Sequence, residues 1–96
     1  MLEIRVDVKD SFGLVRSGGR RFVPGNGLFS FDLKFKVKDC DVFIRHKGNK
    51  ANAKASMAVC CLGVKDGDEI WFEVVGENEQ DAMAAVLELC RKYDVI

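Results

Sequence analysis

Six consecutive residues near the start of the chain combine positive charge with a permissive backbone, which is a combination that can bind anions. Guanidinium groups bind phosphate or sulfate through paired hydrogen bonds, and successive backbone N–H groups around glycines can form an anion-binding nest. The spacing does not match a P-loop, and a flexible solvated loop is the interpretation that we favour for this composition. Both interpretations stay open for the segment, which consists of Arg16, Ser17, Gly18, Gly19, Arg20 and Arg21.

The chain has a single histidine, His46, which is the residue type most often used for acid–base and phosphoryl chemistry near neutral pH. It stands at the end of a predicted strand, just before a turn at Lys47, Gly48 and Asn49. This position is typical of a half-exposed strand residue. We therefore expect His46 to be half-exposed and to have no chemical role.

The four cysteines do not form a recognisable metal or redox motif. None belongs to a C-x-x-C pair, and with one histidine no ligand spacing fits, so no metal and no cofactor is predicted. The sequence shows no secretion-signal pattern, so we expect reduced thiols in a cytoplasmic protein. Cysteines then act as small apolar residues, and the four are Cys40, Cys60, Cys61 and Cys90.

Length and charge set limits on the class of protein. A chain of 96 residues predicts a single domain, residues 1–96. The 15 basic and 15 acidic residues give a net charge of +0, whereas nucleic-acid-binding domains carry a basic excess. The longest apolar run is too short to cross a bilayer. We therefore expect neither a nucleic acid nor a membrane as partner.

The clearest local structure is a strand followed by a helix in the last third of the chain. Residues 69–75 alternate between two faces, with Ile70, Phe72 and Val74 on one of them. After Gly76, a helix is predicted to begin at an Asn78 cap, and its apolar positions recur at helical spacing. Residues 2–8 alternate in the same way. The predicted core combines Leu2, Ile4, Val6, Ile70, Phe72, Val74, Val86 and Leu89.

The order of these motifs resembles the HPr family, the histidine-containing phosphocarriers of the bacterial sugar phosphotransferase system. The matching motifs are Leu62-Gly63, Gly67, the strand residues Ile70 to Val74, Gly76 with Glu79, Ala82, and upstream Gly48-Asn49-Lys50 and Asn52-Ala53-Lys54. The resemblance implies an α+β fold, the HPr-like open-faced β-sandwich. In this fold a four-stranded antiparallel sheet is covered on one face by helices, in the order β-α-β-β-α-β-α. It also implies a protein that is not an enzyme.

The resemblance places the phosphoryl-accepting histidine of the family after a Gly-Leu pair. Gly13 and Leu14 match that pair, and Val15 then stands at the histidine position. A second alignment uses the Asn-Gly-Leu at residues 26–28 and places Phe29 there instead. We prefer the first, because it follows the opening strand at the distance usual in the family. Neither side chain has a lone pair that could attack phosphorus, so both alignments predict that the phosphoryl acceptor is lost.

Residues 16–41 are the part of the chain that fits the family least. Glycines and Pro24 disfavour a helix beginning at Arg16. Residues 28–38 alternate as a strand would, but the family fold requires a helix there to cover the sheet. We favour a helix opened by Asn26, with an additional β-hairpin as the alternative.

The apolar start of the predicted helix at residues 56–62 belongs to the partner-binding surface of the family. Candidate residues for that surface are Leu14, Ser56, Met57 and Cys60. Some HPr proteins carry a regulatory phosphoserine at this helix start, but the matching position is Ala55, and Ser56 is predicted to cap the helix.

We therefore expect a non-catalytic binding or regulatory module whose partner is a protein, with phosphotransferase-system and regulatory proteins as the candidates. The alternative is an active phosphocarrier or regulator that uses a different residue: Ser17, Ser56 or His46.

Overall fold

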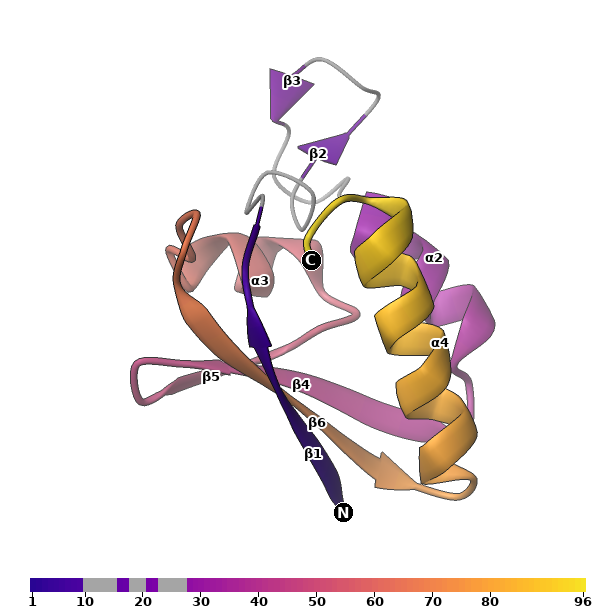
Figure 1. Ribbon diagram of the computed structural model, residues 1–96. Helices are drawn as coiled ribbons and strands as arrows, with labels where there is room; N and C mark the ends of the chain where they lie inside the picture. Colours follow the sequence, from indigo (N-terminus) through magenta and orange to yellow (C-terminus); the bar gives the residue numbers. More distant parts are fainter. Residues whose placement is uncertain (10–15, 18–20, 23–27) are drawn as a thin grey trace.

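The computed structural model describes residues 1–9, 16–17, 21–22 and 28–96, and side chains are described only for residues 1–9 and 29–96. Figure 1 shows a twisted sheet with helices packed on one side of it. Within the described residues, no helix has the length and apolar character needed to cross a membrane.

The sheet has four strands, which lie in the order β1-β6-β4-β5. Every neighbouring pair is antiparallel, so that β6 pairs with β1 along one edge and with β4 along the other. This is the predicted α+β arrangement. The strands are β1 (Leu2–Asp7), β4 (Cys40–His46), β5 (Asn49–Asn52) and β6 (Glu69–Gly76).

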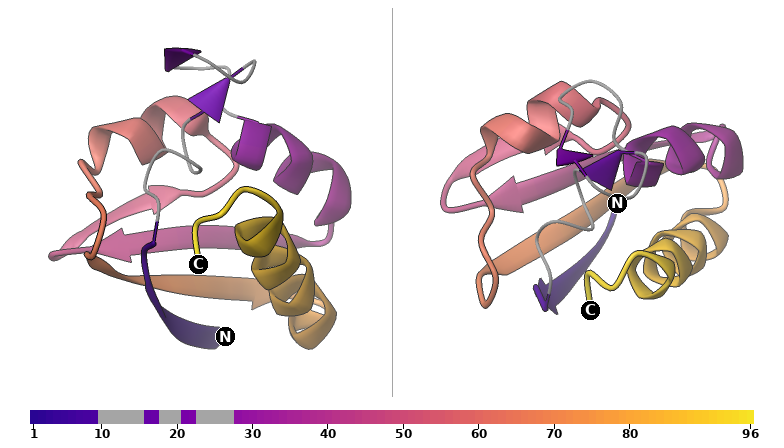
Figure 2. Two further views of the ribbon diagram at one scale, coloured as in Figure 1. Left: turned by 45° about the horizontal axis from the view of Figure 1, so that its top comes forward. Right: turned by 90° about the horizontal axis from the view of Figure 1, so that it is seen from above.

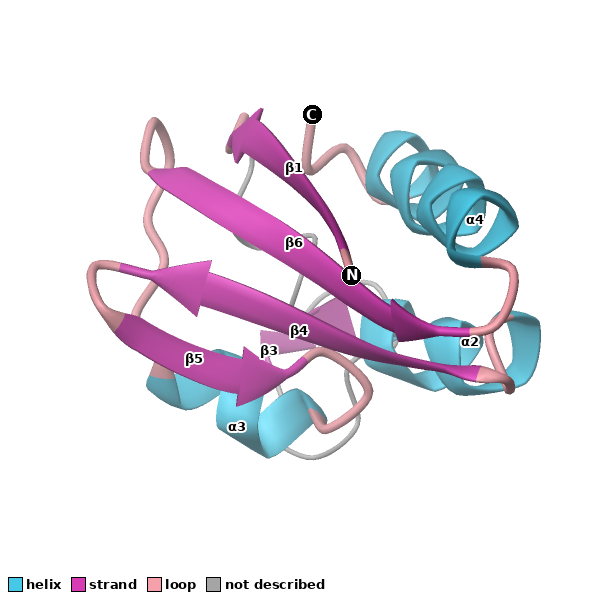
Figure 3. Ribbon diagram, turned by 90° about the horizontal axis from the view of Figure 1, so that it is seen from below, coloured by secondary structure: helices cyan, strands magenta, loops and turns pink. Residues whose placement is uncertain are grey.

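The helices of the described residues all lie on the same face of the sheet, and no described element covers the opposite face (Figure 3). Two views agree that α4 and α2 lie side by side, with α3 near β5 (Figures 2 and 3). The helices are α2 (Leu28–Lys36), α3 (Ser56–Cys61) and α4 (Glu79–Lys92).

The structure decides between helix and strand for residues 28–38 in favour of the helix. Phe29, Leu33 and Val37 are buried and recur every four residues, so they form the face that packs on the sheet. Phe31 and Phe35 point the other way and are exposed. The strict alternation of apolar and polar residues in this segment thus comes from a helix that carries aromatic residues on two opposite sides.

The core predicted from the alternating strands is largely confirmed. Val6 and the inward residues of β6 are buried together with Val86 and Leu89 of α4, whereas Leu2 and Ile4 are only partly buried at the sheet edge. The ring of Phe29 lies 6.1 Å from that of Phe72, which joins α2 to the centre of the sheet.

Two predicted helix caps differ from the observed ones. The N-cap of α3 is Ala55, and Ser56 is instead its first helical residue. Asn78 is the N-cap of α4, but it has a left-handed backbone and makes no side-chain cap bond. The Glu79 carboxylate instead accepts the Gly76 N–H at 3.0 Å, because the chain reverses tightly before the helix.

Gly76 itself is required by close packing at the end of β6. Its φ angle is +144°, and a Cβ atom there would lie 2.6 Å from the backbone oxygen of Asp39. Only glycine fits such an approach of two backbones.

Candidate functional site

The predicted anion-binding segment is divided between described and undescribed residues. Arg16 and Ser17 form β2 (Arg16–Ser17), which pairs antiparallel with β3 (Arg21–Phe22), so that Ser17 lies opposite Arg21. The sequence analysis treated residues 16–21 as a loop and did not predict this strand pairing. Leu14, Val15, Gly18, Gly19 and Arg20 lie outside the described residues.

Val15, which takes the histidine position in the preferred alignment with the family, lies outside the described residues. The second alignment places Phe29, near the start of α2, at that position. Phe29 is fully buried between Phe72 and Tyr93, with ring-centroid distances of 6.1 and 6.3 Å. Its ring therefore belongs to the core and presents no group to a phosphate donor.

His46 does not occupy the half-exposed position that its place in the sequence suggested. Its side chain is only 4% exposed, and both ring nitrogens have oxygen partners. Nδ1 lies 3.1 Å from the backbone oxygen of Leu62, and Nε2 lies 2.8 Å from Oδ2 of Asp68. Both contacts are hydrogen bonds when the ring carries both N–H groups. The prediction of a half-exposed His46 was wrong, because its polar partners Leu62 and Asp68 are distant in the sequence and reach the ring only in the folded chain.

Asp68 links this histidine to the turn before β6. Oδ2 of Asp68 also accepts the N–H of Lys65 at 3.0 Å. That backbone hydrogen bond, followed by the one from His46, holds the pKa of the Asp68 carboxyl below its ordinary value. The Asp68 carbonyl accepts the N–H of Val8 at 2.8 Å. The imidazole thus joins the end of β4, the end of α3 and the turn before β6.

The described part of the candidate partner surface lies on α3. Met57 is 63% exposed, Ser56 and Cys60 are partly exposed, and Val59 is buried against the core. Since Met57 and Cys60 are three residues apart, they lie next to each other on the solvent side of the helix. The geometry therefore brings Ser56, Met57 and Cys60 together, whereas Leu14 lies outside the described residues.

The four cysteines are unpaired, and they differ in exposure. Cys61 is exposed and Cys60 is partly exposed. Cys40 and Cys90 are buried, and burial raises the pKa of both thiols, that of Cys90 to about 12. Among the described residues no group of His, Cys, Asp and Glu side chains is placed to hold a metal ion.

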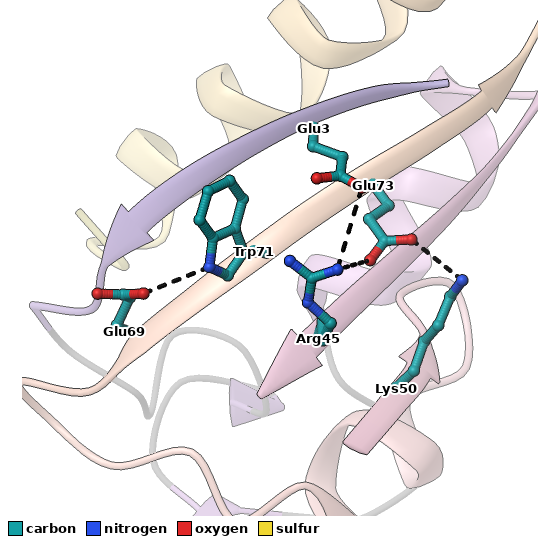
Figure 4. A network of polar contacts seen from close by, with 6 residues as sticks. All are labelled: Glu3, Arg45, Lys50, Glu69, Trp71 and Glu73. Carbon is teal, nitrogen blue, oxygen red and sulfur yellow. Dashed lines mark hydrogen bonds and ion pairs between the residues drawn. The ribbon is translucent and has the colours of Figure 1, made fainter. Parts of the chain in front are cut away.

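A polar network on the uncovered face of the sheet was missed by the sequence analysis (Figure 4). Glu73 of β6 is only 3% exposed, although none of the described helices covers this face. Its carboxylate lies 2.9 Å from Nη1 of Arg45 and 3.0 Å from Nζ of Lys50. Arg45 also lies over the Trp71 ring, 5.3 Å from its centroid. The alternation of strand residues does predict Glu73 and Arg45 on the outward side.

This network neutralises its central carboxylate from two neighbouring strands. The side chains of Arg45 and Lys50 cover Glu73 from β4 and β5, while Glu3 of β1 lies 4.0 Å from Arg45. Because both oxygens of Glu73 have cationic partners, the arrangement holds the strands in register rather than offering a base to a substrate.

Comparison with known proteins identifies the class to which this fold belongs. Residues 33–92, well over half of the chain, match the family described as "PTS-HPr: PTS HPr component phosphorylation site". The chain therefore belongs to the HPr family.

Particular relatives cover almost the whole chain. The HPr-like protein Crh of Halalkalibacterium halodurans is 30% identical over 92 residues, which are 96% of this chain and 99% of that protein. The solution structure of Crh, the Bacillus subtilis "Catabolite Repression HPr", is 30% identical with a TM-score of 0.54, covering 92% of this chain and 94% of that chain.

The fold is also similar to that of the histidine-containing phosphocarrier protein of a Mycoplasma. That structure has a TM-score of 0.75 at 20% identity and covers 99% of this chain and 98% of its own. The family match begins at residue 33, after the segment in which the resemblance would place the phosphorylated histidine.

Proposed function

We propose that this chain is an HPr-family protein that has lost phosphoryl transfer and acts in the cytoplasm as a non-catalytic binding or regulatory module. Its partner is a protein of the phosphotransferase system or a regulator linked to it. The observation that carries the proposal is the state of the single histidine: His46 is buried, and both of its ring nitrogens face acceptor oxygens.

Phosphoryl transfer to histidine requires a nitrogen lone pair that an incoming phosphorus atom can approach in line. At His46 that approach is blocked by the Leu62 carbonyl on one side and the Asp68 carboxylate on the other. His46 is the only histidine in the sequence. No second histidine near Val15 or Phe29 can therefore take the place of the missing phosphoryl acceptor. The names of the relatives, "HPr-like" and "Catabolite Repression HPr", support a regulatory use of the fold.

The binding surface in this proposal is the solvent side of α3, formed by Ser56, Met57 and Cys60. An exposed methionine is adaptable and suits a protein interface. The segment Arg16 to Arg21 remains a candidate anion site, because the β2–β3 pairing brings the backbones of Ser17 and Arg21 together.

One observation favours a second function, regulation through a phosphorylated serine. Ser56 is partly exposed in the first turn of α3, next to the exposed Met57. A phosphate there would add negative charge to the proposed surface and change the partners that it accepts. A phosphoserine is too stable to relay the group onward, so this would be a switch and not a carrier.

The test is incubation with the general phosphotransferase enzyme and labelled phosphoenolpyruvate, with a histidine-containing HPr as positive control. We expect the control to acquire an acid-labile label and this chain to acquire none. An acid-labile label that His46→Gln abolishes would overturn the proposal. A parallel incubation with an HPr serine kinase and labelled ATP, using Ser56→Ala, tests the second function.

A further inference from the structure

Three sulfur-bearing side chains are concentrated on the short helix α3. Met57 is 63% exposed, Cys61 is exposed and Cys60 is partly exposed. Val59, which lies among them in the sequence, is buried and forms the inner side of the helix. The backbone stays helical through Leu62, whose φ and ψ angles are −67° and −24°. All three sulfur-bearing side chains therefore leave a regular helical backbone and are accessible from solvent.

The spacing of these side chains places them on one side of α3. Cys60 and Cys61 follow Met57 by three and four residues, so the three positions span about 100° of the helix circumference. Neighbours at these two spacings have Cβ atoms about 5–6 Å apart. Side chains in a helix also lean towards its N-terminus, so both thiols lean towards the methionine one turn earlier. The thioether of Met57, on a side chain with three rotatable bonds, can reach both of them.

The other two cysteines are separated from this group by the fold. Cys90 is fully buried and Cys40 is 5% exposed, and the Cys40 thiol donates a hydrogen bond to the backbone oxygen of Glu77. Helix α3 lies near β5 and away from α4, which carries Cys90 (Figure 3). A metal ion in solution therefore meets the thiols of α3 and not the buried ones.

Two thiols and a thioether are soft ligands, which select copper(I). Structural zinc sites take four ligands from cysteine and histidine, but His46 is buried with both ring nitrogens facing oxygen atoms. Within the described ranges, no group of His, Cys, Asp and Glu side chains is placed to hold a metal ion. Such groups leave out the thioether of Met57, which is a ligand for a soft monovalent ion.

We propose that Met57, Cys60 and Cys61 form a copper(I) site, which we call the α3 sulfur site. On binding, each thiol releases its proton to solvent, and each thiolate donates an electron pair to the ion. One copper(I) is thus bound as two protons leave, and Sδ of Met57 donates a third electron pair. The ion stays copper(I) throughout, so the step needs no oxidant or reductant. Met57 and Cys60 also belong to the proposed protein-binding surface, but the metal site does not depend on that function.

The experiment is an anaerobic competition for copper(I) itself, using the fully reduced protein. Copper(I) is supplied as its coloured bicinchoninate complex, and loss of the colour reports transfer of the ion to the protein. Native mass spectrometry then counts the ions bound to each chain. We expect one copper per monomeric chain. Because copper(I) is diamagnetic, an NMR titration locates it, and we expect amide shifts centred on residues 56–62.

Three variants test the role of each ligand. Loss of both thiols in Cys60→Ser/Cys61→Ser is expected to weaken copper(I) binding by on the order of a hundredfold or more. Met57→Leu keeps the size of the side chain and removes the sulfur, and is expected to weaken binding about tenfold. Ser56→Ala changes a neighbouring side chain that is not a ligand and should leave the affinity unchanged. Melting temperatures without copper confirm that each variant is folded.

A fourth variant keeps the number of sulfur atoms and changes only their arrangement. Ala58→Cys/Cys61→Ala retains two thiols and the methionine, but positions 58 and 60 point to opposite sides of the helix. We expect this variant to bind copper(I) as weakly as Cys60→Ser/Cys61→Ser does. Equal binding by the rearranged variant and the parent protein would show that any exposed thiols suffice, and it would overturn the proposed site.

Other outcomes would overturn the inference in different ways. Unchanged affinity of Met57→Leu would remove the thioether from the site. Copper found only in a complex of two chains would show bridging between molecules, and displacement of copper(I) by equimolar zinc would contradict the preference for a soft ion. Protection of Cys60 and Cys61 from iodoacetamide by copper(I) provides an independent check. None of these results bears on phosphoryl transfer, which the labelling experiment tests separately.

Discussion

The Nε2 atom of His46 lies 2.8 Å from Oδ2 of Asp68, which connects the end of one central strand to the turn that precedes the other. The same ring reaches the carbonyl of Leu62 through Nδ1. The one histidine of a protein in a phosphohistidine family therefore serves as an internal tie between structural elements.

The first prediction concerns this tie. His46→Phe keeps a planar ring but removes both ring nitrogens, so the Leu62 carbonyl and the Asp68 carboxylate lose their polar contacts with the ring. We expect the free energy of unfolding to fall by about 1 to 3 kcal/mol, measured by urea denaturation. Lys65→Ala, which removes only an exposed side chain, should change it by less than about 0.5 kcal/mol. A His46→Phe variant as stable as the parent would contradict a structural role.

A second prediction compares the buried carboxylate of Glu73 with an exposed ion pair. A double-mutant cycle on Arg45→Gln and Glu73→Gln should give a coupling energy of about 1 to 3 kcal/mol, because the Glu73 side chain is only 4% exposed. Salt should hardly reduce it. The matched cycle on Lys36→Gln and Glu88→Gln, an exposed pair 3.6 Å apart, should vanish near 1 M salt. Equal salt sensitivity of the two cycles would show that Glu73 is solvated.

Acid should destabilise the protein in part through Asp32. The hydrogen bond from Tyr93, and then the one from Lys92, hold the pKa of Asp32 below its ordinary value of 3.8. A lowered folded-state pKa contributes stability above pH 3.8, and this contribution is lost as the pH falls through the folded-state value. Asp32→Asn should therefore cost stability near pH 6, and this cost should shrink progressively as the pH falls below 3.8. Parallel stability curves for the two proteins over that range would disprove the linkage.

Thiol reactivity should follow burial among the four cysteines. The reactive form is the thiolate, and the pKa of Cys90 is raised to about 12 by burial, with that of Cys40 also raised. With iodoacetamide near pH 8, we expect Cys61 to be alkylated first and Cys90 only after unfolding in urea. Peptide mapping by mass spectrometry resolves the sites, and Cys61→Ser removes the fast phase. Alkylation of Cys90 in the native protein at the rate of Cys61 would contradict its burial.

Much of the sheet and of α4 could be predicted from the sequence, because alternation and helical spacing report directly which face a residue buries. The strand around Phe72 and the helix around Val86 are examples. Residues 28–38 were ambiguous, since aromatic side chains on both sides of α2 give the same period-two pattern as a strand. The need to cover the sheet, a property of the whole fold, favoured the helix.

The candidate site was less predictable. Burial of His46 depends on Leu62 and Asp68, which are distant in the sequence and come close only when the sheet forms. Likewise, Glu73 has a low exposure because the side chains of Arg45 on β4 and Lys50 on β5 cover it. No local sequence pattern predicts this burial. Interactions of this kind depend on strand register, which a single sequence specifies only through the completed sheet.

The strand order β1-β6-β4-β5 also bears on how the chain reaches its fold. β4 and β5 are joined by a tight turn and can pair early. β1 can pair only after β6 is present, since Leu2 pairs with Val74. Contacts so far apart in sequence are slow to form because a long loop must close first. Synthesis from the N-terminus therefore leaves β1 as an unpaired strand until β6 has been made.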